Sequence, residues 1–168
     1  MIFNIQNWIL KSPDTVKTLN RILKHHYISR GNELPTNDTK KKVNDGCVLR
    51  FCRATGKFQR IAHLDYTMFY PSIVYGLKLN PSTDHMKSYR HLLLSVMKAL
   101  NNTEFDEQKK IKGFLTKMCS GWLNSDDFVF RDSKMHRKVL MHGTKILKRA
   151  VTITDSDPKF RILTVNTD

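Results

Sequence analysis

The sequence of 168 residues has few cysteines and no long apolar run. Its cysteines, Cys47, Cys52 and Cys119, are odd in number, and the closest two have no second pair that would complete a four-ligand zinc site. We therefore interpret all three as reduced, structural thiols. The longest apolar stretches, around 92–94 and 146–147, are far shorter than the roughly 18 residues of a membrane-spanning helix, so we expect no membrane segment.

Several functional signals are also absent. The segment 1–10 has no basic leader and no small-residue cleavage site, so it does not resemble a secretory signal and we expect an intracellular protein. There is no Gly-x-x-x-x-Gly-Lys phosphate loop and no Gly-x-Ser-x-Gly nucleophile elbow. The histidines show no spacing typical of metal ligands. A composition of 40% apolar and 26% charged residues excludes wholesale disorder and predicts a globular chain.

Acidic residues are scarce relative to basic ones. The chain has 29 Lys and Arg against 15 Asp and Glu, a formal net charge of +14. The excess is spread over the sequence, with 12 basic and 4 acidic residues in 1–60 and 17 and 11 in 61–168. Because cations placed near phosphates release condensed counterions, this balance favours a polyanionic partner, with nucleic acid ahead of a membrane surface.

Helical spacing predicts four helices. The first begins at Ser12-Pro13-Asp14 and ends before Gly31, and a polar, basic connector over 32–44 follows it. Segments 84–100 and 104–123 form an antiparallel pair that reverses at Asn101-Asn102, with Thr103 as the second N-cap. The fourth helix covers 135–149.

Short alternating segments predict strands. Segments 47–51 and 58–63 flank a turn at Thr55-Gly56, and a third strand is expected to end near Asp65. A second hairpin is expected from 150–154 and 161–165, on either side of the turn at 155–158.

The most specific motif runs from Leu64 to Val74 and contains Asp65-Tyr66-Thr67-Met68-Phe69-Tyr70-Pro71-Ser72-Ile73. It resembles motif A of the family B DNA polymerases, Asp-x-x-Ser-Leu-Tyr-Pro-Ser-Ile, with Met68 and Phe69 in place of Ser-Leu. The resemblance implies that Asp65 is a catalytic metal ligand and that Tyr70 excludes a ribose hydroxyl, with Met68 and Phe69 also next to the deoxynucleotide. The alternative is an aspartate at a strand end followed by a Tyr-Pro turn that packs a core.

Nucleotidyl transfer by this family requires two carboxylates that hold two Mg²⁺ ions. In the resemblance, the second carboxylate comes from motif C, Tyr-Gly-Asp-Thr-Asp-Ser, and this chain ends in Thr164-Val165-Asn166-Thr167-Asp168. Asp168 matches the metal ligand that pairs with motif A, whereas Asn166 replaces the first aspartate. The alternative is a chance match at the tail.

A motif B resemblance lies between these segments. The family places Gln-x-x-x-Lys-x-x-x-Asn-Ser-x-Tyr-Gly on a fingers helix, and this chain has Gln108, Lys112 and Thr116 at a spacing of four, on one helical face. The resemblance implies that Lys112 and Thr116 contact the nucleotide and that Arg90 reaches the triphosphate from the other helix. Thr116 replaces Asn, and the motif's Tyr is missing. The alternative for Lys112 is a solvated basic face.

Upstream, the segment 44–48 resembles the Tyr-x-Gly-Gly element that lies close to the template in the family, with one glycine, Gly46, retained. Basic residues around it are expected to contact DNA phosphates, the alternative being solvated side chains. The DNA contacts we predict are Gly46, Lys40, Lys41, Lys42 and Arg50.

The order of these motifs predicts an α+β fold: a polymerase palm with an antiparallel, ferredoxin/RRM-like sheet that brings Asp65 and Asp168 together, plus a fingers helix pair. The segments would be an N-terminal helix and basic linker (1–44), palm (45–84), fingers (85–124) and palm again (125–168).

The implied function is DNA-templated DNA synthesis from deoxynucleoside triphosphates on a primer-template, in the nucleus or at a viral replication site. An exonuclease or thumb polypeptide, or a processivity factor, would be supplied separately. The alternative is a non-catalytic, nucleic-acid-binding remnant of such an enzyme.

Overall fold

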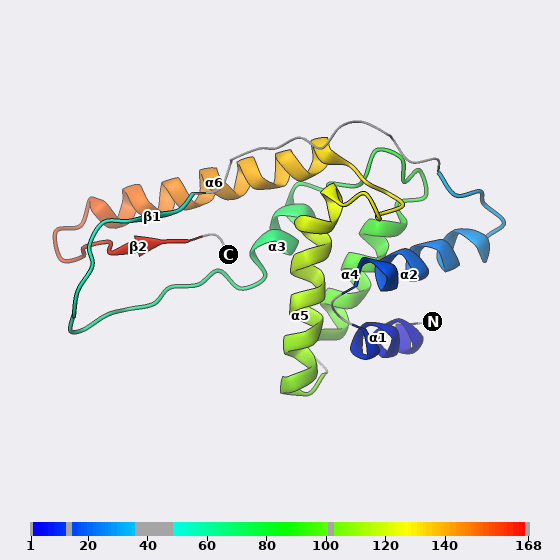
Figure 1. Cartoon of the computed structure of the whole chain (residues 1–168), viewed down its shortest axis with the longest axis horizontal. Helices are drawn as coiled ribbons and strands as arrows, with labels where there is room; N and C mark the ends of the chain where they lie inside the picture. The colour runs from blue at the N-terminus through cyan, green and yellow to red at the C-terminus, as the bar shows by residue number, and fades with distance from the viewer. Residues whose placement is uncertain (1, 13–14, 36–48, 101–102, 167–168) are drawn as a thin grey trace.

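The computed structural model describes residues 2–12, 15–35, 49–100 and 103–166, and it combines helices with a small antiparallel sheet in an α+β arrangement (Figure 1). The helices are α1 (Ile2–Lys11), α2 (Val16–Ile28), α3 (Phe69–Gly76), α4 (Ser88–Leu100), α5 (Phe105–Cys119), the 3₁₀ helix η1 (Gly121–Asn124) and α6 (Ser133–Asp155). The strands β1 (Phe51–Cys52) and β2 (Thr164–Val165) pair with Phe51 opposite Val165. Within these residues, no helix has both the length and the apolar character needed to cross a bilayer.

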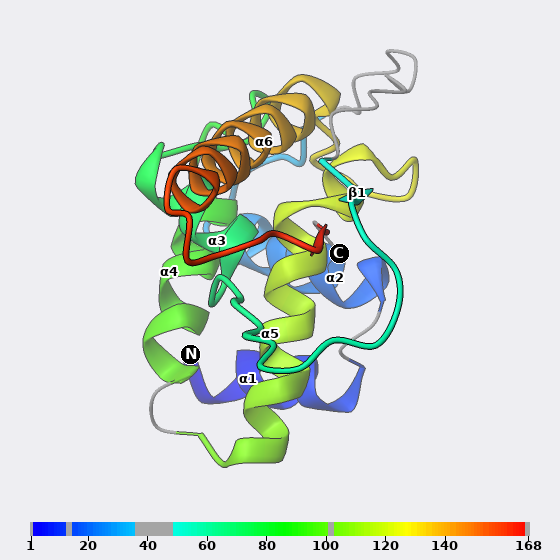
Figure 2. The ribbon, with the colours of Figure 1, turned by 90° about the vertical axis from the view of Figure 1, so that its left-hand side faces the viewer.

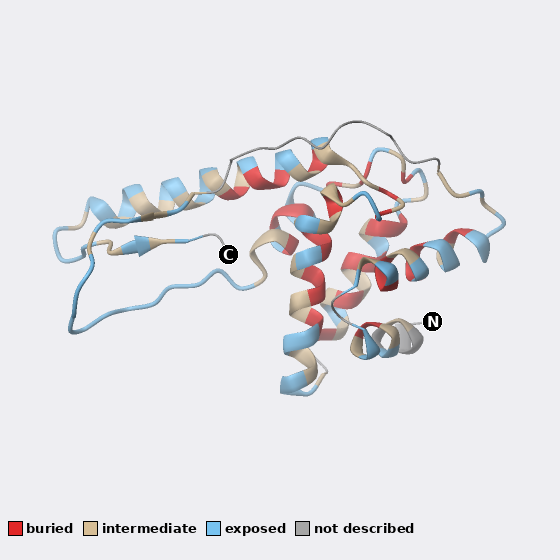
Figure 3. Cartoon of the chain, in the orientation of Figure 1, coloured by how far each residue is buried: buried red, intermediate tan, exposed pale blue. Residues whose placement is uncertain are grey.

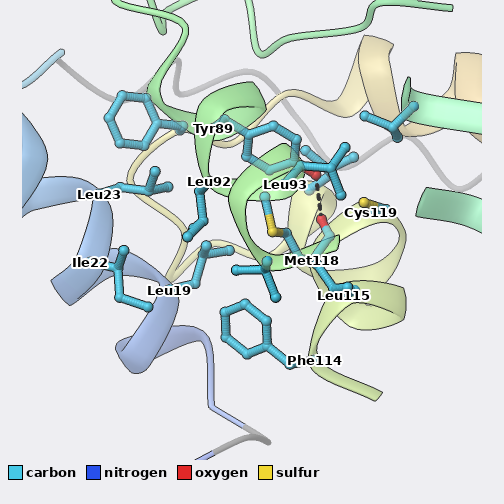
Figure 4. Close-up of a cluster of buried hydrophobic side chains, with 14 of the residues drawn as sticks. Leu19, Ile22, Leu23, Tyr89, Leu92, Leu93, Phe114, Leu115, Met118 and Cys119 are labelled. Atoms are coloured by element: carbon cyan, nitrogen blue, oxygen red, sulfur yellow. Dashed lines mark hydrogen bonds between the residues drawn. The ribbon is translucent and has the colours of Figure 1, made fainter. Parts of the chain in front are cut away.

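The core lies between α2, α4 and α5. Figure 4 shows apolar side chains of the three helices in contact, and Leu19, Leu93 and Phe114 are fully buried there. Each such side chain contributes roughly 1.5–3 kcal/mol when it is removed from water. The Tyr89 hydroxyl is also buried and donates to the backbone carbonyl of Met118 at 2.7 Å, which joins α4 to α5.

The predicted helix pair is confirmed: α4 and α5 lie side by side and run in opposite directions (Figure 2). Their ends differ from the prediction. The first begins at Ser88 because the Asp84 carboxylate, outside the helix, accepts the backbone N–H groups of Ser88 and Tyr89 at 3.1 and 2.8 Å. Thr103 does not cap α5, whose N-cap residue is Glu104; the Thr103 hydroxyl instead donates to the carbonyl of Ala99. The reversal at 101–102 lies outside the described residues.

The first predicted helix is present as α2, with a later start. Thr15 is its N-cap and accepts the N–H of Thr18, whereas the predicted cap was Ser12 and residues 13–14 lie outside the description. Gly31 has a φ of +68°, which supports its predicted role in ending the segment.

The prediction of a strand at 150–154 is wrong, because α6 continues through these residues to Asp155. No glycine or proline interrupts the helix there, and two β-branched residues satisfy their hydroxyls within it: Thr152 donates to the Lys148 carbonyl and Thr154 to the Ala150 carbonyl, both at 3.0 Å. β2 therefore pairs with β1 rather than with a strand at 150–154.

The strands predicted at 58–63 and before Asp65 are also absent from the described residues, where 54–66 carry no regular structure. Ile61 and Leu64 are 64% and 87% exposed, so an alternating pattern here has no neighbouring layer to bury its apolar side chains (Figure 3). Only the end of the predicted strand 47–51 is described, and Phe51 begins β1. The sheet of the described residues thus has two strands, and motif A is not one of them.

Helix α6 packs on α3 through a small residue. Gly143 lies so close to the Phe69 ring that a Cβ at this position would be 3.1 Å from Phe69 Cε1. The second half of α6 extends beyond the helical bundle (Figure 1), where Asp155 pairs with Arg53 at 2.7 Å and so connects the end of α6 to the segment after β1. The core includes residues from each of the segments 1–44, 45–84, 85–124 and 125–168, whose boundaries remain a prediction.

Candidate nucleotide site

Motif A forms the turn that leads into α3. Met68 is in the left-handed region, at φ 55° and ψ 45°, a conformation that costs a non-glycine residue about 1 kcal/mol. Its carbonyl accepts the N–H of Ser72 at 2.8 Å, the first hydrogen bond of the helix. The Met68 side chain that follows from this turn is partly buried and packs against the core.

A pocket of about 350 Å³ lies where this turn meets the helix pair. We call it the Lys112 pocket; its lining residues are Thr67 and Met68 from motif A, Met97 and Leu100 from α4, and Gln108 and Lys112 from α5. Lys112 is the charged residue in this set, and the two methionines with Leu100 form an apolar wall. The pocket thus offers a cation for an anionic group and a soft, apolar surface for a ring.

The predicted motif B face is present on α5. Gln108, Lys112 and Thr116 are all half-buried and lie one turn apart. The Gln108 amide donates to the Thr103 carbonyl at 3.0 Å, which ties the start of α5 to the segment before it. The structure brings Lys112 and Gln108 to the motif A turn, whereas Thr116 is outside the lining of the Lys112 pocket.

Arg90 lies on the same face of α4 as the pocket residue Met97, two turns or about 10 Å along the helix axis. Its guanidinium Nε is buried and has no hydrogen-bond acceptor within the described part of the chain. Arg90 therefore lies outside the lining of the Lys112 pocket.

Phe69 and Tyr70 follow Met68 but face elsewhere. Phe69 lines a second pocket of about 320 Å³, formed with residues of α3 and with His142 and Ile146 of α6. The Tyr70 ring packs against the core with its centroid 5.3 Å from that of Phe69, and it lines neither pocket. The predicted sugar contact of Tyr70 is therefore not brought to the Lys112 pocket in this structure.

The Asp65 side chain is exposed and has no hydrogen-bond or ion-pair partner among the residues that the structure describes. Its predicted partner ligand, Asp168, lies outside the described residues, as do Lys40, Lys41, Lys42 and Gly46. Arg50 is exposed immediately before β1. An exposed, unpaired carboxylate fits the hard oxygen ligand that Mg²⁺ prefers.

Three pocket residues were missed by sequence reasoning: Thr67, Met97 and Leu100. Met97 and Leu100 are three residues apart near the end of α4, a spacing that marks one helical face but does not distinguish a pocket wall from a core. Thr67 lies inside the motif A string, where the resemblance leaves its position unspecified.

Comparisons of the chain with protein-family models, with curated proteins and with solved structures gave no match.

Proposed function

We propose that the chain is the palm-and-fingers part of a DNA-directed DNA polymerase that adds deoxynucleotides to a primer on a DNA template. The observation that carries the proposal is the Lys112 pocket, in which the turn resembling motif A meets the helix resembling motif B. The two motifs are more than 30 residues apart in the sequence, so their meeting at a pocket with one cation supports a shared ligand.

In this proposal the Lys112 ammonium binds the triphosphate of the incoming nucleotide. The charge on the phosphate oxygens increases as the bond to the leaving pyrophosphate breaks, so a fixed cation stabilises the transition state more than the ground state. The apolar side chains of Met68 and Met97 would contact the base or sugar and exclude water. Arg90, whose Nε lacks an acceptor among the described residues, would bind a phosphate that extends beyond the pocket.

Asp65 and Asp168 are the residues that would hold two Mg²⁺ ions, which neutralise phosphate charge and lower the pKa of the primer hydroxyl when bound. In the reaction the primer 3′-hydroxyl gives its proton to solvent water, and its oxygen bonds to the α-phosphorus. The bond from the α-phosphorus to the bridging oxygen breaks, and pyrophosphate leaves.

A second candidate function is a non-catalytic remnant that only binds nucleic acid. It is favoured by the position of Asp65, which is exposed on a segment without regular structure rather than fixed at the end of a sheet strand. A carboxylate that is not fixed by its surroundings is poorly preorganised for metal binding.

Primer extension with Mg²⁺ separates the two candidates. We expect Asp65→Ala to abolish extension and Lys112→Met to reduce incorporation about 100-fold, the typical effect of removing one group that stabilises transition-state charge. Lys110→Met is the matched control, since this exposed lysine lies two residues away on the opposite face of α5 and is expected to leave the rate within about twofold.

Equal rates for the wild type and Asp65→Ala would overturn the catalytic proposal. So would a wild-type chain that binds primed DNA but fails to extend it at any nucleotide concentration, and this result would support the remnant.

A further inference from the structure

Helix α6 carries a row of cations along its exposed side. Of its 23 residues, six are Lys or Arg and one, Asp155, is acidic. All six cations are exposed. Arg137 takes part in another interaction of the chain, and the other five form what we call the α6 stripe: Lys134, Lys138, Lys145, Lys148 and Arg149.

The stripe occupies one side of the helix. With 3.6 residues per turn, its five members lie within about 100° of one another around the axis and extend over about 22 Å along it. The buried residues of α6, among them Val139 and Gly143, lie on the other side, toward α3 (Figure 3). The stripe is therefore a straight, rigid array of charge that faces away from the core.

The cations of the stripe are not neutralised by the fold. None of the five side chains has an ion pair or a hydrogen bond within the described part of the chain, and the acidic residue of the helix, Asp155, pairs with Arg53. Neighbouring like charges on one helix face repel one another. Such an array is stabilised by a partner that carries regularly spaced negative charges.

A duplex is the polyanion that matches this geometry. Each strand of B-DNA places one phosphate per 3.4 Å of axis, so about 22 Å of helix spans several phosphates of one strand. A membrane surface is the weaker match, because an interfacial helix buries an apolar face in the lipid. In the first half of α6 that side is packed against α3, where Gly143 lies against the Phe69 ring. The second half exposes Ile146 and Ile153, which is a short apolar face for an interfacial helix.

We infer that the α6 stripe is a binding surface for the phosphate backbone of duplex DNA. The choice of DNA rests on the proposed function, while the surface itself is separate from the Lys112 pocket: no member of the stripe lines that pocket. The contacts are with phosphates only, so the stripe binds without sequence preference and positions the duplex on the molecule.

The test is the salt dependence of binding by the full chain to a fluorescent 20-base-pair DNA duplex. The stripe variant combines Lys138→Gln, Lys145→Gln, Lys148→Gln and Arg149→Gln. Each neutralised phosphate contributes about 0.9 to the slope of log affinity against log salt, so four lost contacts reduce the slope by about 3.6.

The control variant removes the same four charges from exposed positions on other helices: Lys17→Gln, Lys24→Gln, Lys109→Gln and Lys110→Gln. We expect its slope to change by less than about 1. Circular dichroism establishes that both variants are folded, and Lys145→Glu, a single charge reversal, provides a second weakening if the fourfold variant unfolds.

An equal change of slope in the stripe and control variants would overturn the inference, because it would indicate a general effect of net charge. An unchanged slope in the stripe variant would overturn it as well. If the stripe variant lost binding to vesicles of anionic phospholipid but bound DNA as the wild type does, the surface would be assigned to a membrane instead.

Primer extension by the same proteins keeps this result separate from the proposed function. A chain that binds duplex DNA through the stripe yet never extends a primer retains the inference and loses the polymerase proposal. If the wild-type chain extends primers but the stripe variant has an unchanged salt slope, the polymerase proposal is retained and the inference is lost.

Discussion

The His26 imidazole on α2 contacts the start of α4. Its Nδ1 is 2.7 Å from the Ser88 hydroxyl, and its ring lies edge-on to that of His91. Burial, followed by the positive charges of Arg30 and His91, lowers the pKa of His26 below its usual value of 6.5, and the Asp84 carboxylate opposes this shift. The neutral imidazole is therefore the form that the folded state favours.

This pKa shift predicts an acid-side loss of stability. The unfolded chain, in which the His26 pKa is near 6.5, binds this proton more tightly than the folded chain does. The contribution of His26 to the free energy of unfolding is therefore fully present above about pH 6.5, and it is lost as the pH decreases toward the folded-state pKa. Between pH 7.5 and pH 5, we expect the melting temperature of His26→Gln to fall by less than that of the wild type. His63→Gln, at an exposed position, is the control, and a wild-type-like pH profile for His26→Gln would contradict the assignment.

The cysteines differ in their environments. Cys52 and Cys119 are both free thiols, as predicted, and Cys52 is exposed whereas Cys119 is part of the core. Burial raises the pKa of the Cys119 thiol to about 12, so it remains protonated and acts as a small apolar residue. The interpretation as a structural thiol thus fits Cys119, while Cys47 lies outside the described residues.

At the scale of elements, the ends of the helices depend on side chains that lie outside them. Asp132 is the N-cap of α6, where its Oδ1 accepts the N–H of Met135 at 2.8 Å. Its Oδ2 accepts the N–H of Ser82, also at 2.8 Å, from the loop that follows α3. One carboxylate therefore starts the longest described helix and fixes a loop 50 residues away in the sequence.

We predict that Asp132→Ala destabilises the protein by about 1–2 kcal/mol, since it removes a cap and leaves the Ser82 N–H without its acceptor. In a chain of this size, the melting temperature falls by about 2–4 °C per kcal/mol. Asp132→Asn is the matched control. Its amide oxygen still accepts one N–H, so we expect about half of the destabilisation caused by Asp132→Ala. Thermal unfolding followed by circular dichroism measures both, and equal losses for the two variants would indicate that charge, not capping, matters.

At the scale of the whole molecule, Asp84 connects elements that are distant in the sequence. Its side chain is 2% exposed and accepts the Tyr27 hydroxyl of α2 at 2.6 Å, together with the two N–H groups that begin α4. The burial of Tyr27 and its hydrogen bond to Asp84 raise the pKa of this tyrosine, which therefore stays a donor. A buried carboxylate with three donors orients α2 against α4.

Asp84→Ala is expected to be among the costly substitutions, at about 3 kcal/mol, because it leaves three buried donors without an acceptor. Tyr27→Phe removes one of these donors and is expected to cost about 1–2 kcal/mol. Glu33→Ala, at an exposed carboxylate, is the control and is expected to change stability by less than about 0.5 kcal/mol. Urea unfolding gives the three values, and an Asp84→Ala loss as small as that of Glu33→Ala would refute the role of the network.

Some features followed from the sequence because they depend on local chemistry. Helical spacing predicted α2, the antiparallel pair of α4 and α5, and most of α6, since an apolar face with a period of 3.6 residues can be recognised from the sequence alone. The charge of +14 is likewise a property of composition. The resemblance to motifs A and B named Met68 and Lys112, which the structure places in one pocket.

Other features were decided only by tertiary contacts. Residues 58–63 alternate like a strand but remain irregular because no layer covers them. The Lys112 pocket required the left-handed turn at Met68 to face α5. The packing of α6 against α3 at Gly143 likewise determines which side of that helix faces solvent. Local pattern specifies a face, but the contacts between elements specify what that face meets.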